Sequence, residues 1–84
     1  MVNVGGRVTN ANGRGIPRTL IKLTDGAGVV RTTYTGPFGY YNFADVEVGQ
    51  TFIIEVLAKR HSFKDPTRVL SFDDEVTSIN FVAN

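Results

Sequence analysis

Thr-Gly-Pro-Phe-Gly-Tyr-Tyr-Asn-Phe, residues 35–43, is the stretch of sequence that decides the fold of this chain. Pro37 sets φ near the value that the second position of a turn requires, and Gly39 can take the positive φ that leads into the next strand. In that strand Tyr41 and Phe43 lie two residues apart and share a face, while the residue between them points the other way. The stretch therefore predicts a β-hairpin whose second strand turns two aromatic side chains toward a core.

Strands are also predicted along the rest of the chain, where apolar residues alternate with polar ones between turn signals. The expected strands are residues 2–9, 16–24, 29–35, 40–44, 51–59, 67–72 and 76–82. Asn12-Gly13 is a strong turn signal, and the segments 25–28 and 73–75 supply further turns. No segment has the period of a helix. We therefore expect a single domain over residues 1–84, folded as a seven-stranded antiparallel Greek-key β-sandwich.

The spacing of apolar residues and glycines along nearly the whole chain resembles the carboxypeptidase regulatory-like domain, a small prealbumin-like, or transthyretin-like, β-sandwich. At the hairpin the family pattern is Thr, a turn, Gly, x, Tyr or Phe, x, Phe, as in residues 35–43. The segment 16–24 is similar to the family's Gly-x-Pro-x-x-Ala-x-Val-x-Leu, which places Thr19, Ile21 and Leu23 inward. Residues 52–56 match Tyr-x-Leu-x-Val, whereas the link at 59–66 lacks the family's glycine and offers Phe63 as its apolar anchor.

The core is expected to form from residues on the inward side of these strands and from the hairpin glycine. These residues are Val8, Ile21, Leu23, Gly39, Tyr41, Phe43, Phe52, Ile54, Val56, Ile79 and Phe81. Val46 is expected to close one end of the sandwich. A hydrophobic fraction of 42% with 20% charged residues is ordinary for a globular domain, and 84 residues leave room for one core only.

Charge and cysteine content narrow the classes of function. The formal net charge of +1 gives no field strong enough to indicate a nucleic acid or an anionic membrane as partner. The chain has no cysteine, which excludes disulfides and thiolate chemistry, and no run of about 18 apolar residues for membrane insertion. Residues 1–6 lack the features of a signal peptide. A cytoplasmic protein and a domain of a longer secreted chain both remain open, and we favour the second, at an extracellular or cell-surface location.

The sequence does not predict an enzyme, a cofactor or a metal site. His61 is the only histidine, and it lies in a basic loop without a carboxylate to orient it. The catalytic sandwiches of related fold, hydroxyisourate hydrolases and intradiol dioxygenases, need further histidines that this chain lacks. The acidic turn 73–75 lacks the alternating ligands and the glycine of a calcium loop. The outward positions expected for Glu55 and Asn80 argue against a lysine–asparagine crosslink.

Two groups of apolar and aromatic residues are candidates for contact with a partner. An apolar contact surface is expected where side chains fall opposite the core positions of neighbouring strands, at Leu20, Ile53 and Leu57. Exposed aromatic rings, able to stack on a glycan or fill a protein pocket, are expected on or beside the hairpin at Tyr34, Phe38 and Tyr40. Scattered surface residues and rings that cover the end of the sandwich are the alternative interpretations of these groups.

Charged residues form a third group, sorted along the chain. The basic loop contains Lys59, Arg60 and Lys64, and the acidic turn contains Asp73, Asp74 and Glu75. The strand expected at 67–72 should place these segments at opposite poles, where copies of the domain could meet end to end.

The interpretation that agrees best with these patterns is a non-catalytic, extracellular or cell-surface module that serves as a spacer, adhesion or assembly unit. Its expected partners are neighbouring domains, copies of itself or another surface protein, with a glycan as a further possibility. The alternatives are a carbohydrate-binding module that uses the exposed aromatic residues and an accessory domain that steadies a neighbouring peptidase.

Overall fold

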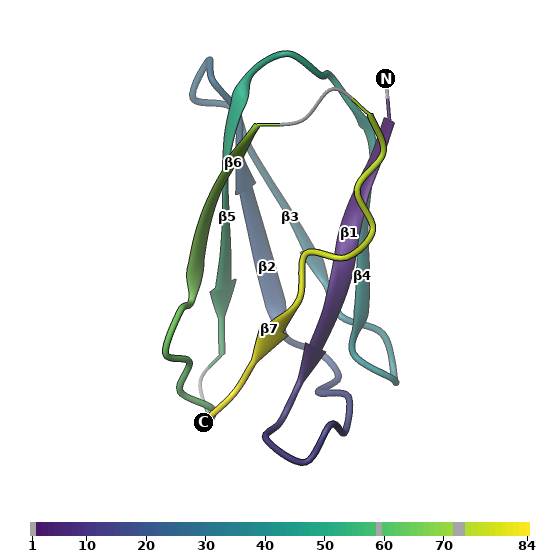
Figure 1. The fold of residues 1–84 in the computed structure, drawn as a ribbon, viewed down its shortest axis with the longest axis vertical. Coiled ribbons are helices and arrows are strands. Elements are labelled where there is room, and N and C mark those ends of the chain that lie inside the picture. Colours follow the sequence, from purple (N-terminus) through teal and green to yellow (C-terminus); the bar gives the residue numbers. More distant parts are fainter. Residues whose placement is uncertain (1, 59, 72–73) are drawn as a thin grey trace.

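The computed structural model describes residues 2–58, 60–71 and 74–84 as seven strands in two packed sheets (Figure 1). The strands are β1 (Val2–Thr9), β2 (Leu20–Thr24), β3 (Val30–Tyr34), β4 (Tyr40–Val46), β5 (Thr51–Leu57), β6 (Thr67–Ser71) and β7 (Phe81–Val82). One sheet has the order β4-β1-β7 and the other the order β3-β2-β5-β6. The predicted all-β sandwich is therefore confirmed.

The hairpin predicted over residues 35–43 forms between β3 and β4. The N–H of Gly39 donates to the carbonyl oxygen of Gly36 at 3.0 Å, and the N–H of Gly36 donates to that of Tyr40 at 2.8 Å. Gly39 has a φ of +87°, and a Cβ at this position would lie 2.2 Å from the carbonyl oxygen of Val8. Glycine is required here for both reasons, the backbone conformation and the close approach of β1.

The core lies between the sheets, and period-two alternation places its side chains. All eleven residues predicted for it are buried, and Val46 joins them. Phe63 is half-buried against the core, as expected of the anchor in the long link. The buried set also includes residues that the sequence analysis did not single out: Val4, Ile16 and Ala83.

The four-stranded sheet is regular and antiparallel throughout. Each of its three strand pairs keeps one register over five residue pairs. β2 begins at Leu20 rather than at residue 16, because Pro17 has no N–H and Arg18 adopts a left-handed φ of +55°. The other predicted strands in this sheet differ from the observed ones at their ends, and the ends predicted at 59 and 72 lie outside the described residues.

The three-stranded sheet departs from the expectation of antiparallel pairing. β1 pairs antiparallel with β4 but parallel with β7, and a further parallel bridge joins Val4 to Val76. The strand predicted at 76–82 is confined to Phe81–Val82, because residues 77–80 cross β1 at Gly6 instead of following its ladder. A Cβ at Gly6 would lie 1.8 Å from the carbonyl oxygen of Ile79, so only glycine allows this crossing.

The parallel pairing of the first and last strands fixes where the chain enters and leaves. Both strands run in the same direction along the long axis, so Val2 and Asn84 lie at opposite ends of the molecule (Figure 1). The principal extents are 34 × 19 × 16 Å, which makes this axis about twice as long as the others.

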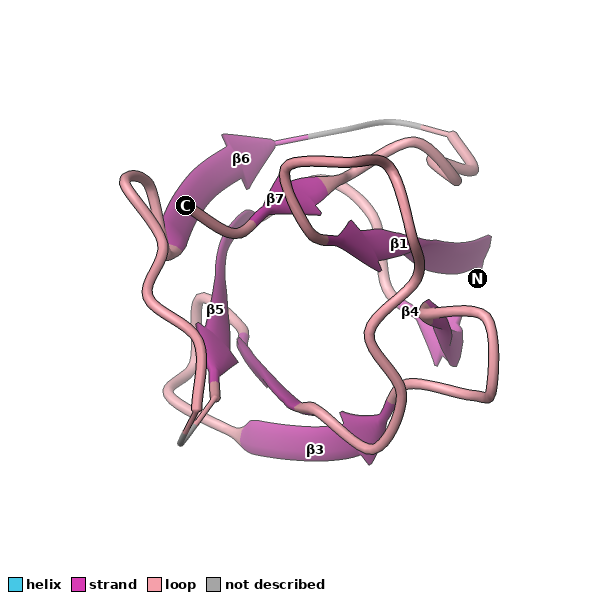
Figure 2. Cartoon of the chain, turned by 90° about the horizontal axis from the view of Figure 1, so that it is seen from below, coloured by secondary structure: helices cyan, strands magenta, loops and turns pink. Residues whose placement is uncertain are grey.

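Two arginine side chains close the open sides of the sandwich, where the sheets are not joined by hydrogen-bonded strands. Arg31 lies on the edge strand β3 and donates to the carbonyl oxygen of Ala44 at 2.6 Å. Arg68 lies on the other edge strand, β6, and donates to that of Asn80 at 2.9 Å. Seen along the long axis, β3 approaches β4 and β6 approaches β7, so the strands form a ring (Figure 2). Inward charges on edge strands also discourage pairing with another sheet.

Candidate functional site

The outer face of the four-stranded sheet carries an apolar row that crosses three strands near one end. Leu20 on β2 is paired with Tyr34 on β3 and with Leu57 on β5. Tyr34 is 64% exposed and Leu57 is 42% exposed. Neighbouring strands thus bring Leu20 and Leu57 together as the sequence analysis predicted, and they add Tyr34 to the same row.

Ile53, the third residue of the predicted apolar contact surface, lies in a different row. It is paired with Thr24 on β2 and with Val69 on β6, which is 65% exposed. Lys22 and Glu55 are paired between the two rows. The predicted surface is therefore two apolar rows separated by a charged pair. Val69 was missed, although its position between inward-facing residues of β6 is a signal that period-two alternation could have used.

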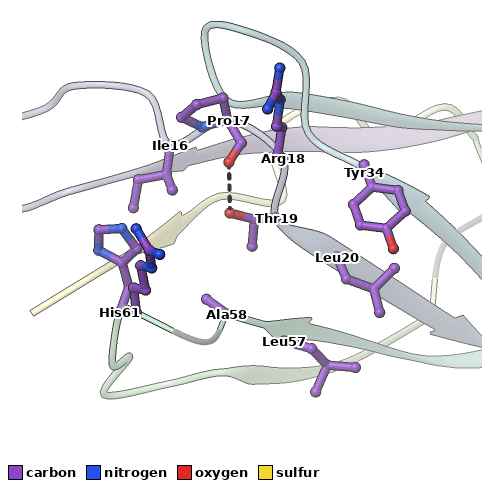
Figure 3. Close-up of a pocket in the computed structure, with 10 residues that line it drawn as sticks. Ile16, Pro17, Arg18, Thr19, Leu20, Tyr34, Leu57, Ala58 and His61 are labelled. Atoms are coloured by element: carbon purple, nitrogen blue, oxygen red, sulfur yellow. Dashed lines mark hydrogen bonds between the residues drawn. The ribbon is translucent and has the colours of Figure 1, made fainter.

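A pocket of about 820 Å³ lies at the end of the first row (Figure 3). Its walls come from the segment before β2, the end of β3 and the segment after β5. The lining residues are Ile16, Pro17, Arg18, Thr19, Leu20, Tyr34, Leu57, Ala58, Arg60 and His61. Most of this lining is apolar, and the described part of it contains cationic side chains but no carboxylate. A pocket of this size could hold a small ligand.

Thr35 holds the wall of this pocket in place through a buried set of hydrogen bonds. Its hydroxyl donates to the carbonyl oxygen of Ile16 at 2.7 Å and accepts from the N–H of Thr19 at 2.9 Å. Its carbonyl oxygen accepts from the N–H of Arg18 at 3.1 Å. These bonds keep Arg18 in its left-handed conformation, which costs about 1–3 kcal/mol for a residue other than glycine.

The arginine side chains at the pocket, Arg18 and Arg60, differ from most arginines elsewhere in the fold. Arg7, Arg31 and Arg68 each donate to a backbone carbonyl and lie over an aromatic ring, at 4.9, 5.8 and 5.3 Å from the ring centre. In contrast, the side chains of Arg18, Arg60 and His61 at the pocket make no hydrogen bond, ion pair or ring contact with any described residue. No described residue therefore competes with a ligand for the guanidinium groups of Arg18 and Arg60.

The other two candidate aromatic residues lie away from this pocket. Tyr40 is paired with Arg7 in the three-stranded sheet and is 60% exposed on its outer face. Phe38 is 70% exposed and lines a separate hollow of about 560 Å³ with the turn at residues 12–15. Tyr34, Phe38 and Tyr40 therefore do not share one platform, because they belong to different faces of the sandwich.

Charge is sorted between the two ends of the molecule. Arg60 and Lys64 lie in the connection between β5 and β6, at the end where Asn84 lies, and Asp74 and Glu75 lie at the opposite end (Figure 1). The strand directions place further acidic residues with the latter pair, Asp25, Asp45 and Glu47, and further basic residues with the former, Arg14 and Arg18. Asp65 is an acidic residue at the basic end. Lys59 and Asp73, also predicted for the poles, lie outside the described residues.

The described residues include one deeply buried tyrosine and no cluster of side chains that could hold a metal ion. No three His, Asp or Glu side chains lie close enough among them to hold a metal ion together. Tyr41 is deeply placed, and its hydroxyl donates to the carbonyl oxygen of Ile79 at 2.5 Å. Burial raises the pKa of Tyr41 well above its usual range, with a smaller opposing effect from Arg68, so this hydroxyl acts as a donor within the core.

Within the part of the chain that the structure describes, no helix has the length and hydropathy to span a bilayer.

Comparison with known proteins assigns the chain to no family. No protein-family model matches the sequence, and no curated protein shows significant similarity to it.

Proposed function

We propose that this domain is a non-catalytic structural module of the extracellular or cell-surface kind, a spacer, adhesion or assembly unit that resembles carboxypeptidase regulatory-like domains. The observation that carries the proposal is the parallel pairing of β1 and β7. Because of it, the chain enters at one end of a 34 Å axis and leaves at the other, as an extended array of domains requires. A neighbouring domain or another copy is the natural partner.

The same pairing suits a domain that transmits tension. A pull on the two ends draws β1 and the C-terminal segment past each other, so their hydrogen bonds are loaded together rather than one after another. Backbone bonds join these segments along most of β1, from Gly5 N–H to the carbonyl oxygen of Val76, from Ile79 N–H to that of Gly5 and from Ala83 N–H to that of Thr9. Separation of the ends therefore requires several bonds to break at once.

The charge distribution has the polarity that an array needs. The basic end of each domain is the end where its chain leaves, and the acidic end is the end where the chain enters. Successive copies in one chain would therefore bring opposite charges together. Each exposed ion pair contributes about 1 kcal/mol or less, so the contact orients tethered neighbours rather than joining free ones.

A tandem protein tests this function, with Asn84 of one copy joined directly to Val2 of the next. Small-angle scattering should give a maximum dimension near twice the 34 Å axis. Reversal of Asp74 and Glu75 to lysine should broaden the distribution of inter-domain angles, as should high salt. Glu55→Lys is the control, because it reverses a charge in the middle of a sheet. A compact, folded-back dimer, or an unchanged distribution after reversal at the acidic end, contradicts the proposal.

A further inference from the structure

We propose that the pocket at the end of the four-stranded sheet binds an acidic sugar, a ring that carries a carboxylate. This site is additional to the spacer function. The pocket is lined by outward-facing side chains of β2, β3 and β5, so it opens toward the side of the sandwich, and by Arg18 and Arg60, which also belong to the basic end (Figure 3).

The apolar part of the pocket fits the body of a sugar. Leu20 and Leu57 form a continuous surface across β2 and β5, and the ring of Tyr34 lies beside them at 64% exposure (Figure 3). An aromatic ring next to aliphatic side chains offers the C–H face of a pyranose a surface on which to stack. The phenol hydroxyl of Tyr34 makes no hydrogen bond to a described residue, so it is available to a sugar hydroxyl.

The cationic part of the pocket sets the class of sugar. Arg18 and Arg60 carry guanidinium groups that no described residue engages, and a guanidinium binds a carboxylate through two parallel hydrogen bonds. His61 adds a further nitrogen donor or acceptor. The described lining has no carboxylate that would compete for these groups or bind the hydroxyls of a neutral sugar. A carboxylate-bearing ring therefore matches the pocket better than a neutral one.

The backbone conformation of Arg18 indicates that the surrounding structure holds this residue in a defined position. The left-handed conformation is unfavourable for arginine, and glycine would adopt it without strain. Thr35 nevertheless fixes this conformation from the buried side through Thr19 and Arg18 itself. Strained backbone that the surroundings enforce is found preferentially at binding sites.

The acidic end of a second copy is the competing occupant, because Asp74 and Glu75 also carry carboxylates. The shape of the pocket favours the sugar. The apolar row and the exposed Tyr34 ring offer a stacking surface for one ring that carries its own carboxylate, whereas the acidic end would have to supply a ring and its carboxylates from separate side chains. The experiment includes this occupant as a separate probe.

The test is a titration of the ¹⁵N-labelled protein with four probes. They are trigalacturonate, its methyl ester, 3′-sialyllactose and an acetylated, amidated peptide of residues 72–76. We expect at least one acidic sugar to shift the amide signals of Leu20, Tyr34 and Leu57. If trigalacturonate is a sugar that binds, we expect it to bind about tenfold more tightly than its methyl ester. The proposal is overturned if neither acidic sugar shifts these amides at about 10 mM, or if trigalacturonate binds and its ester binds as tightly. Tighter binding of the peptide also overturns it and assigns the pocket to a second copy.

Matched variants separate the pocket from general charge and exposed rings. Arg18→Gly should weaken binding of the acidic sugar about tenfold while the melting temperature stays the same or rises, because the variant also relieves the left-handed strain. Arg14→Ala removes a positive charge outside this pocket and should leave affinity within about twofold. Tyr34→Ala should weaken binding about tenfold and Tyr40→Ala should not, although both rings are similarly exposed. Equal losses within either pair contradict the assignment.

Discussion

The two sheets of this sandwich are built in different ways. In the four-stranded sheet every strand pair keeps a single register, and the outer face carries two apolar rows open to solvent. In the three-stranded sheet β1 pairs with β4 along one edge, in a ladder that contains a register shift. Along its other edge β1 is hydrogen-bonded to the irregular C-terminal segment that ends in β7. The first sheet is a regular surface, and the second joins the first strand of the chain to its C-terminal segment.

The two sheets should therefore differ in how substitutions affect them: one sheet is sensitive in its stability, and the other is sensitive in its binding. Positions in the three-stranded sheet where backbones approach closely, such as Gly5 and Gly6, cannot accept a side chain. Outward positions on the four-stranded sheet can vary more, because their side chains are exposed or half-buried on the face away from the core. Substitutions should therefore have large effects on folding in the first set and small ones in the second, where binding and association should respond instead.

The largest effect is expected at Gly6. In Gly6→Ala the new Cβ would lie 1.8 Å from the carbonyl oxygen of Ile79, and the neighbouring atoms belong to the backbone, so the C-terminal segment must move away from β1. We expect the free energy of unfolding to fall by about 3 kcal/mol or more, measured by urea denaturation. Gly36→Ala is the control, because the nearest atom to its Cβ would be 3.8 Å away. Equal stability of the two variants would show that this crossing does not hold the sheet together.

The next effect is expected at Tyr41, whose hydroxyl joins β4 to the C-terminal segment. Tyr41→Phe should lower the free energy of unfolding by about 1–3 kcal/mol, because the carbonyl oxygen of Ile79 loses a buried donor. The wild-type protein should also lose stability as the pH rises above about 10, the usual tyrosine pKa, because the unfolded chain ionises there while burial keeps Tyr41 protonated in the folded one. This contribution is fully present below that pH.

Comparison of the two proteins by urea denaturation across the alkaline range isolates the contribution of Tyr41. The pH dependence should be weaker in Tyr41→Phe, and Tyr40→Phe should behave as wild type because that ring lies on the exposed face. Identical alkaline behaviour of wild type and Tyr41→Phe would show that the hydroxyl does not couple the strands.

Sequence patterns were sufficient for the features that depend on local periodicity. Alternation placed Phe52, Ile54 and Val56 in the core, and the turn chemistry around Gly39 predicted the hairpin. The opposite-face positions of Leu20 and Leu57 followed from the same period, so two of the three residues in the apolar row at the pocket were predictable. These inferences need no knowledge of which strands are neighbours across the two sheets.

Features that depend on contacts between distant segments could not be predicted. The parallel pairing of β1 and β7 is decided by how residues 77–80 cross Gly6, and no local pattern describes such a crossing. Arg31 and Arg68 would be expected to face solvent, because a charged residue in a strand usually does. The pocket depends on Arg18, whose conformation is fixed by Thr35 from the other side of a β-hairpin.

The smallest effect on folding, and the sharpest test of the comparison, is expected in the second apolar row. Ile53→Thr and Val69→Thr replace outward side chains that are 42% and 65% exposed by one that keeps the β-branch. The free energy of unfolding should change by about 0.5 kcal/mol or less, as for other surface positions. If this row is a contact surface between copies, light scattering across a concentration series should show weaker association in the double variant, and high salt should not reproduce that change. Ile54→Thr, one residue along and fully buried, is the control, because it should lower stability by more than about 1 kcal/mol. Destabilisation of similar size in all three variants would mean that the outer face of the four-stranded sheet contributes as much to stability as its inner face does. The outer face of this sheet would then not be free to serve in binding, and the proposed difference between the two sheets would be wrong.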